Sequence, residues 1–293
     1  MTSIRKEGKV NEDTTLIDVM MLGLPGGVAI YLVEGGKKCL IDGGNGPEAR
    51  RLVKVLQKLN AFPPDIIIVT HFHFDHTQGI PYFRKKAAKM QKKIEVMASQ
   101  TAIPLLEDQS NNDIFGMGPY KNILEVTPLK EGDKVDLDGI ILKIFEVPGH
   151  TKDHIAILDE KNRNIFIGDA IGAKVTDDFF STPPFMPPLF DKNDYYNSIN
   201  KLKKINYETL CLAHFGYIYD EEAKGILDES VSTFEKWWQL FEDNIGKLDD
   251  IAYMVDKVLE NCFPAYIDKK LAKIRLQNSV PWLINSFKTC KKV

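Results

Sequence analysis

Over roughly the first 215 residues, short hydrophobic runs rich in β-branched residues alternate with stretches of helical periodicity. The early runs predict strands at 15–22, 27–34 and 38–41. After Pro47, leucine and valine residues recur at helical spacing and predict an amphipathic helix. The run 65–70, in which residues 66–69 are all apolar, predicts a short strand that is covered on both faces.

Two hairpins are expected further along the chain, at 134–147 and 155–167. The stretch 179–190 has four prolines among aromatic residues, so we expect a semi-rigid loop that is neither helix nor sheet interior. A helix at 191–205 and a last strand at 209–213 follow.

After about Tyr219 the pattern is helical only, and a third helical run from Lys269 is expected to be interrupted or kinked at Pro281. The chain is therefore interpreted as an α/β body, residues 1–218, followed by a C-terminal helical extension, residues 219–293.

Composition narrows the class of protein. The 293 residues are 44% hydrophobic and 27% charged, with a net charge of −3, which excludes a collagen, a long coiled coil and a mostly disordered chain. The four cysteines are far apart and are typical of reduced thiols. Because neither a signal segment nor an apolar run of membrane-spanning length is visible, we expect a cytoplasmic protein without membrane contact.

Three of the six histidines lie within six residues, in the run His71-Phe72-His73-Phe74-Asp75-His76. This HxHxDH run directly follows the buried strand at 65–70, where side chains leaving the sheet can converge. Neutral imidazole suits borderline metals such as zinc, and the carboxylate adds charge for a second ion. The run therefore indicates a metal site rather than a loop of solvated histidines.

Three further residues lie at predicted strand ends: His150, Asp169 and His214. Each alone would indicate little. Together with the HxHxDH run, however, His150 and His214 bring the number of histidines at predicted strand ends to five of six. The sixth histidine, His154, is interpreted as structural or as support for the ligands.

The order of these motifs resembles the metallo-β-lactamase superfamily of hydrolases, which includes glyoxalase II, lactonases and tRNA-processing nucleases, over roughly residues 15–216. The resemblance implies a four-layer αββα sandwich with metals at one edge between its two sheets. It assigns one metal to His71, His73 and His150, and a second metal to Asp75, His76 and His214. Asp169 would bridge the two metals, and Asp42 would orient the ligands from behind.

The chemistry expected of such a centre is metal-assisted hydrolysis. Two divalent ions, Zn²⁺ by default but with iron or manganese also suited to these ligands, would activate a shared water or hydroxide. Asp75 and Asp169 are the candidate catalytic residues, which would orient the nucleophile and shuttle its proton. The predicted substrate is a small ester, thioester, lactone or lactam, with promiscuous use of several. A phosphodiesterase or nuclease and an iron-dependent dioxygenase are the alternatives.

Residues near the substrate are less clearly indicated. The aromatic loop suggests an apolar pocket lined by Phe179, Phe185 and Met186, and Tyr217 beside His214 is a further candidate. Lysine clusters such as 84–93 are interpreted as solvated helix faces, so a nucleic-acid partner is not expected. The tail helices would pack on the body or on a second copy in a homo-oligomer.

Overall fold

The computed structural model describes residues 7–174, 180–214 and 216–292. Within them, the first sheet runs in the order β1-β2-β3-β4-β5-β6-β7 and is antiparallel up to β4 and parallel from β4 to β7. Its strands are β1 (Gly8–Lys9), β2 (Thr14–Asp18), β3 (Ala29–Glu34), β4 (Lys38–Ile41), β5 (Ile66–Val69), β6 (Glu95–Ser99) and β7 (Val126–Leu129).

The second sheet runs in the order β15-β14-β11-β10-β9-β8. Its strands are β8 (Lys134–Asp136), β9 (Ile141–Glu146), β10 (Ile155–Asp159), β11 (Asn164–Phe166), β14 (Thr209–Leu212) and β15 (Gly216–Tyr219). A small separate hairpin pairs β12 (Ala173–Lys174) with β13 (Phe180–Thr182).

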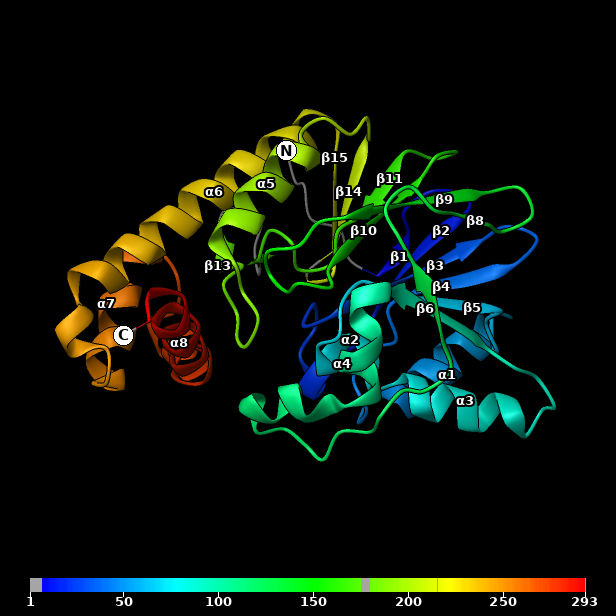
Figure 1. The fold of residues 1–293 in the computed structure, drawn as a ribbon, viewed down its shortest axis with the longest axis horizontal. Coiled ribbons are helices and arrows are strands. Elements are labelled where there is room, and N and C mark those ends of the chain that lie inside the picture. The colour runs from blue at the N-terminus through cyan, green and yellow to red at the C-terminus, as the bar shows by residue number, and fades with distance from the viewer. Residues whose placement is uncertain (1–6, 175–179, 215, 293) are drawn as a thin grey trace.

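Helices cover the outer faces of both sheets (Figure 1). Those after the early strands are α1 (Ala49–Lys58), α2 (Phe74–Thr77), α3 (Ile80–Ala88) and α4 (Ile103–Glu107), with the short 3-10 turns η1 (Met21–Gly23), η2 (Gln100–Ala102) and η3 (Gln109–Phe115). Those on the other side are α5 (Lys192–Leu202), α6 (Asp220–Asp243), α7 (Ile251–Cys262) and α8 (Lys269–Lys291), with η4 (Ile245–Lys247) between α6 and α7.

The layers follow from alternation along the strands. In β4, Leu40 packs into the core shared with α1 and α3, whereas its neighbours Cys39 and Ile41 pack into the core between the sheets. In the second sheet, Phe166 faces the inner core and Ile165 faces the core shared with α5 to α8. Three buried cores therefore separate four layers, which confirms the αββα sandwich expected from the sequence.

Helix α6 packs on the second sheet, and α7 and α8 pack on α6 through an aromatic core (Figure 1). Phe234, Trp237 and Phe241 of α6 and Phe287 of α8 are buried in the same cluster as Ile165. Helix α8 continues through Pro281 as one helix, so the expected interruption there is not seen. The stretch 179–190, expected to be a loop that is neither helix nor sheet interior, supplies the short strand β13 of a two-stranded hairpin.

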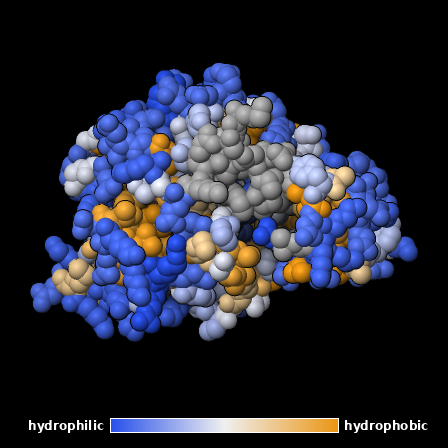
Figure 2. All heavy atoms as spheres, turned by 180° about the vertical axis from the view of Figure 1, so that it is seen from behind, coloured by the Kyte–Doolittle hydropathy of each residue, from blue (hydrophilic) through white to orange (hydrophobic). Residues whose placement is uncertain are grey.

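The face drawn in Figure 2 is mostly hydrophilic, and its hydrophobic side chains gather in separate patches. No helix in the described ranges is long and apolar enough to cross a membrane.

Candidate metal centre

The predicted ligands lie at the edge of the sandwich where strands of both sheets end. His71 and His73 follow β5 of the first sheet, and His150, Asp169 and His214 follow β9, β11 and β14 of the second. His76 and Asp75 lie on the single turn of α2, directly after the two earlier histidines. The structure thus brings together all seven side chains, which are spread over 144 positions from His71 to His214.

Three imidazoles form the first ligand group. His71 Nε2 lies 3.0 Å from His73 Nδ1, and His150 Nε2 lies 3.1 Å from the same atom. Ligand nitrogens about 2.0–2.1 Å from a tetrahedral zinc ion lie about 3.3 Å from one another, close to the observed spacing. All three side chains are buried, so these nitrogens converge in a place that is largely shielded from solvent.

Asp75, His76 and His214 form the second ligand group, whose ligand atoms all lie within 4.8 Å of one another. Asp75 Oδ1 lies 3.7 Å from His76 Nε2, and Asp75 Oδ2 lies 3.8 Å from His214 Nε2. The Asp75 carboxylate therefore stands between the two imidazoles.

Asp169 lies between the two groups. Its Oδ2 is 4.0 Å from His71 Nε2 and 3.7 Å from His150 Nε2 in the first group. The same oxygen is 3.4 Å from His76 Nε2 and 3.2 Å from His214 Nε2 in the second group. One carboxylate oxygen thus reaches nitrogens of both groups, which is the arrangement that a bridging ligand requires.

Hydrogen bonds behind the ligands orient the rings. The Nδ1–H of His76 donates to Asp42 Oδ2 at 2.8 Å, which leaves Nε2 directed into the centre. Asp42 also accepts bonds from the backbone N–H and the hydroxyl of Thr70, and the Thr70 hydroxyl lies 3.1 Å from His71 Nδ1. The structure therefore places Asp42 where it orients one histidine of each group.

Backbone carbonyls orient the rings of His150 and His214. His150 Nδ1 donates to the carbonyl of Pro184 at 2.6 Å, and His214 Nδ1 donates to the carbonyl of Gly27. His154 stacks on His71 and accepts the backbone N–H of Asp169 at 3.1 Å, so it positions the bridging residue. This contact agrees with the supporting role inferred for His154 from the sequence.

Burial and nearby charge shift the pKa values of the histidines in opposite directions in the two groups. Burial, reinforced by neighbouring imidazoles, lowers the pKa of His71 and His73 well below the ordinary value. At His76 burial acts in the same direction, but the carboxylates of Asp75, Asp169 and Asp42 outweigh it and raise its pKa well above the ordinary value. The same competition, with Asp169 the strongest carboxylate, raises the pKa of His214 to about 9.

Two buried polar atoms support a fit to metal ions. His76 Nε2 and Asp169 Oδ1 have no hydrogen-bond partner although neither atom touches solvent. A buried polar atom left without a partner costs about 1–3 kcal/mol, so such atoms require a reason. Imidazole nitrogens and carboxylate oxygens without thiolate suit zinc, iron and manganese, and these atoms face where such an ion would lie.

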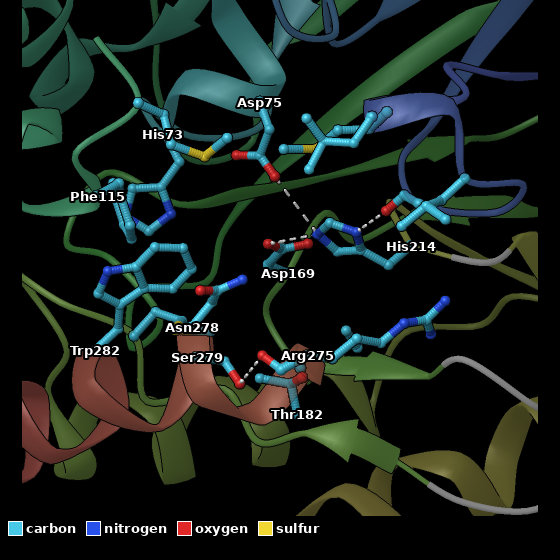
Figure 3. A pocket seen from close by; sticks show the side chains of 18 of the residues that line it. His73, Asp75, Phe115, Asp169, Thr182, His214, Arg275, Asn278, Ser279 and Trp282 are labelled. Atoms are coloured by element: carbon cyan, nitrogen blue, oxygen red, sulfur yellow. Dashed lines mark hydrogen bonds and ion pairs between the residues drawn. The ribbon is translucent and has the colours of Figure 1, made fainter. Parts of the chain in front are cut away.

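A cavity of about 850 Å³ opens onto the centre. His73, Asp75, His150, Asp169 and His214 form its floor, and Figure 3 shows Asp75, Asp169 and His214 directed toward one another. The walls come from the segment around η1, from the loop after η3 and from α8, and their lining residues include Met21, Leu22, Leu24, Phe115, Met117, Ile274, Arg275, Asn278 and Trp282.

Of the residues predicted to line the substrate pocket, some lie at the cavity and others do not. Met186 does line the cavity. Phe185 does not, because it is fully buried among Phe234, Trp238 and Phe241 in the core of the helical extension. Tyr217 also lies elsewhere, with its hydroxyl bonded to the carbonyl of Lys9, and Phe179 is outside the described residues.

The contribution of α8 to the cavity was not predicted. Arg275, Asn278 and Trp282 recur at spacings of three and four residues and share one face of α8. That spacing is visible in the sequence, but a face mixing cationic, amide and aromatic groups is also typical of a solvated surface. Only the folded chain shows that this face lies over the centre.

A family model described as the Metallo-beta-lactamase superfamily matches residues 23–214. The "Beta-lactamase-like protein 2 homolog" of Caenorhabditis elegans is 27% identical over 192 residues, which are 64% of this chain and 56% of that protein. This chain therefore spans little more than half of that relative. The "Probable metallo-hydrolase YqjP" of Bacillus subtilis (strain 168) is 25% identical over 289 residues, covering 88% of each chain.

A solved structure titled "Crystal structure of TTHA1623 in a di-iron-bound form" superposes with a TM-score of 0.53 and 26% identity, covering 67% of this chain and 91% of that one. The match with YqjP is long enough to reach into the C-terminal helices, whereas the family model ends at His214. Because the family model spans well over half of the residues and ends at His214, the chain belongs to the metallo-beta-lactamase superfamily.

Proposed function

We propose that this protein holds two divalent metal ions and hydrolyses a small acyl substrate, namely an ester, thioester, lactone or lactam. The observation that carries the proposal is the position of Asp169 Oδ2, within 4.0 Å of one ring nitrogen each from His71, His76, His150 and His214. TTHA1623, which has the same fold, is described in a di-iron-bound form, and this supports a two-metal centre here.

The two ligand groups would hold one ion each, and Asp169 would be shared. When bound, such ions polarise a carbonyl oxygen and lower the pKa of a water between them toward ~7. Zn²⁺ is the ion we propose first, because five of the seven proposed ligands are imidazoles; iron remains the main alternative.

The chain itself orients the reactants and moves a proton. Asp75 lines the cavity, with one carboxylate oxygen near His76 and the other near His214, so it is placed to accept a hydrogen bond from the attacking water. After the carbonyl is attacked, a proton has to reach the leaving group. Asp75 and Asp169 are the acidic residues at the cavity floor, and we assign that transfer to them.

The cavity supports a small-molecule substrate with an apolar part. Its volume of about 850 Å³ lies within the ordinary range of small-ligand sites. Apart from the floor, the described lining residues include a single cation, which does not favour a nucleic-acid backbone. We propose that the enzyme is cytoplasmic and accepts several related acyl compounds.

The test is metal analysis combined with a substrate panel. The purified chain is expected to hold two metal equivalents and to hydrolyse one or more members of a panel of esters, thioesters, lactones, β-lactams and phosphodiesters. Asp169→Ala is expected to lose one metal equivalent and most activity. Asp138→Ala is the control, because its exposed carboxylate pairs with Lys37 and does not line the cavity, so the substitution should change neither quantity.

If the wild-type protein holds two ions but cleaves only the phosphodiester, the acyl hydrolase proposal is wrong and a phosphodiesterase or nuclease is indicated instead. An Asp169→Ala variant that keeps two ions would show that the bridging assignment is wrong.

A further inference from the structure

The C-terminal helix α8 forms one side of the cavity over the metal centre. Figure 3 shows Arg275, Asn278, Ser279 and Trp282 rising from this helix into the cavity, opposite Asp75 and the metal-ligand histidines. The amide of Asn278 points toward Asp169. A bound substrate would therefore touch the metal centre on one side and α8 on the other.

The cavity rim is unusually hydrophobic for a solvent-facing surface. The described residues include ten large hydrophobic side chains that are exposed, and four of them line this one cavity: Leu22, Leu24, Met117 and Ile274. Leu22 is 63% exposed and Ile274 is 55% exposed. The four come from the η1 turn and its following loop, from the loop after η3 and from α8, so they approach the opening from separate segments. Exposed apolar residues gathered around an opening are typical of a site that receives apolar ligand surface.

Arg275 is the exception in this apolar wall. Among the described lining residues outside the metal centre it is the only charged side chain. It forms no ion pair within the described part of the chain. In Figure 3 its side chain extends along the cavity below His214. A guanidinium group is always protonated and presents several donors suited to a carboxylate or a phosphate.

We propose that the substrate of the hydrolase proposed above is an amphipathic acyl anion, whose apolar body lies against the hydrophobic rim and whose carboxylate or phosphate group is bound by Arg275. Hydrolysis then takes place at an ester, thioester or lactone carbonyl on the metal-centre side of the same molecule. Arg275 acts as a specificity-determining residue, since it binds the substrate but lies outside the ligand groups.

Matched phenyl esters test the charge requirement. Monophenyl pimelate and phenyl heptanoate have acyl chains of the same length and differ in a terminal carboxylate, and phenyl 6-phosphonohexanoate supplies a phosphonate at that end. The wild-type enzyme is expected to favour one of the anionic esters by about tenfold or more in kcat/KM, as for a hydrogen bond to a charged group. The preferred ester distinguishes a carboxylate from a phosphate substrate.

The variant to compare is Arg275→Gln, with Lys273→Gln as its matched control. Lys273 is a cation on the same helix that pairs with Asp256 of α7 and does not line the cavity. Arg275→Gln is expected to abolish the preference for the anionic ester. Its kcat/KM for the uncharged phenyl heptanoate and its metal content should stay as in the wild type. Arg275→Lys retains the charge and should keep most of the preference, and Lys273→Gln should keep all of it.

A binding measurement separates this inference from the proposed activity. Calorimetric titration uses three anilides that resist hydrolysis: pimelic acid monoanilide, 6-phosphonohexananilide and the neutral heptananilide. The wild type should bind at least one of the two anions about tenfold tighter than it binds heptananilide. Arg275→Gln should bind that anion and heptananilide with equal affinity. If no ester is cleaved but this difference is seen, the hydrolase proposal fails and the anion site stands. If Arg275→Gln retains the wild-type preference, or if the wild type shows none, the anion site is refuted.

Discussion

The indole ring of Trp282 lies edge-on to the phenyl ring of Phe115, with their centroids 5.1 Å apart. Phe115 in turn packs edge-on against His73, a histidine of the first ligand group, also at 5.1 Å between centroids. Helix α8, close to the end of the chain, is therefore connected to the metal centre through a single intervening ring. This contact explains how a helical extension that contributes no metal ligand shapes the cavity.

Replacing Trp282 by Ala should widen the cavity and weaken substrate binding without removing metal. We expect KM for apolar acyl substrates to rise about tenfold, because the indole supplies a large apolar surface at the opening. Loss of the ring pair with Phe115 should lower the free energy of unfolding by about 1 kcal/mol. Steady-state kinetics, metal analysis and denaturant unfolding measure these effects.

Ile245→Ala is the control for Trp282, because Ile245 is 50% exposed and lies outside the cavity lining. Unchanged KM in the Trp282→Ala variant would mean that α8 does not contact the substrate.

Asp42→Asn should weaken metal binding at the second ligand group. Asp42 Oδ2 accepts the Nδ1–H of His76, and replacing its charged oxygen with an amide removes this support. Asp42 has a φ of 66°, a conformation that Asn tolerates, so the backbone should not be strained. The expected loss in metal affinity is about 10- to 100-fold, as for other outer contacts of metal-bound histidine.

Competition with a chelator measures the affinity of the Asp42→Asn variant for the first and the second metal equivalent separately. The first ligand group should lose less affinity, because Asp42 reaches His71 only through Thr70. Equal losses at both equivalents would contradict this division.

Gly168→Ala should displace Asp169. Gly168 has a φ of 49°, and a Cβ atom there would lie 2.7 Å from His154 Nε2 and 2.8 Å from Thr70 Oγ1. Both neighbours are part of the support behind the ligands, so neither can move without disturbing the centre. We expect a loss of about 1–3 kcal/mol in the free energy of unfolding and loss of the second metal equivalent, measured by unfolding and metal analysis.

Gly139→Ala provides the matched control for Gly168. It also has a positive φ, 121°, but its Cβ would meet nothing within 4 Å. If the two variants bind metal equally well, the crowding around Gly168 does not position Asp169.

Much of the fold, and the seven residues that meet at the candidate metal centre, could be predicted from sequence because their signals are local. The HxHxDH run is contiguous, and His150, Asp169 and His214 each follow a recognisable apolar strand. The strands β6 and β7 were not predicted. β7 contains Pro128, and most of its residues are not buried, so its hydrophobic pattern is weak.

The cavity walls could not be predicted because they depend on long-range packing. Phe185 was expected at the substrate, but α6 offers it an aromatic core, and four rings surround it there. Conversely, Trp282 and Arg275 lie in a helix whose sequence position says nothing about the metal centre. Only the docking of α8 on the body brings them to the cavity.

Loading the centre with metal should release protons, and the second ligand group should be their source. In the metal-free protein the carboxylates around His76 hold its pKa well above the ordinary value, and that of His214 is raised to about 9, so both rings are protonated at pH 7. His71, His73 and His150 have lowered pKa values, are already neutral, and have no proton to lose. A metal ligand must be deprotonated, so each bound proton competes with the ion.

Zn²⁺ binding should therefore release close to two protons per chain from His76 and His214 near pH 7, in addition to a proton lost by a metal-bound water, and fewer from these rings as the pH approaches 9. The sign follows directly: removing protons as the pH rises favours the metal-bound form, so overall affinity increases up to about pH 9 by about tenfold per pH unit for each proton displaced. Calorimetry in two buffers of different ionisation enthalpy counts the protons. The His214→Asn variant should release one proton fewer, whereas replacing His150, which is neutral beforehand, should leave the number unchanged. Metal affinity independent of pH between 6.5 and 8.5 would show that His76 and His214 are not protonated in the metal-free centre.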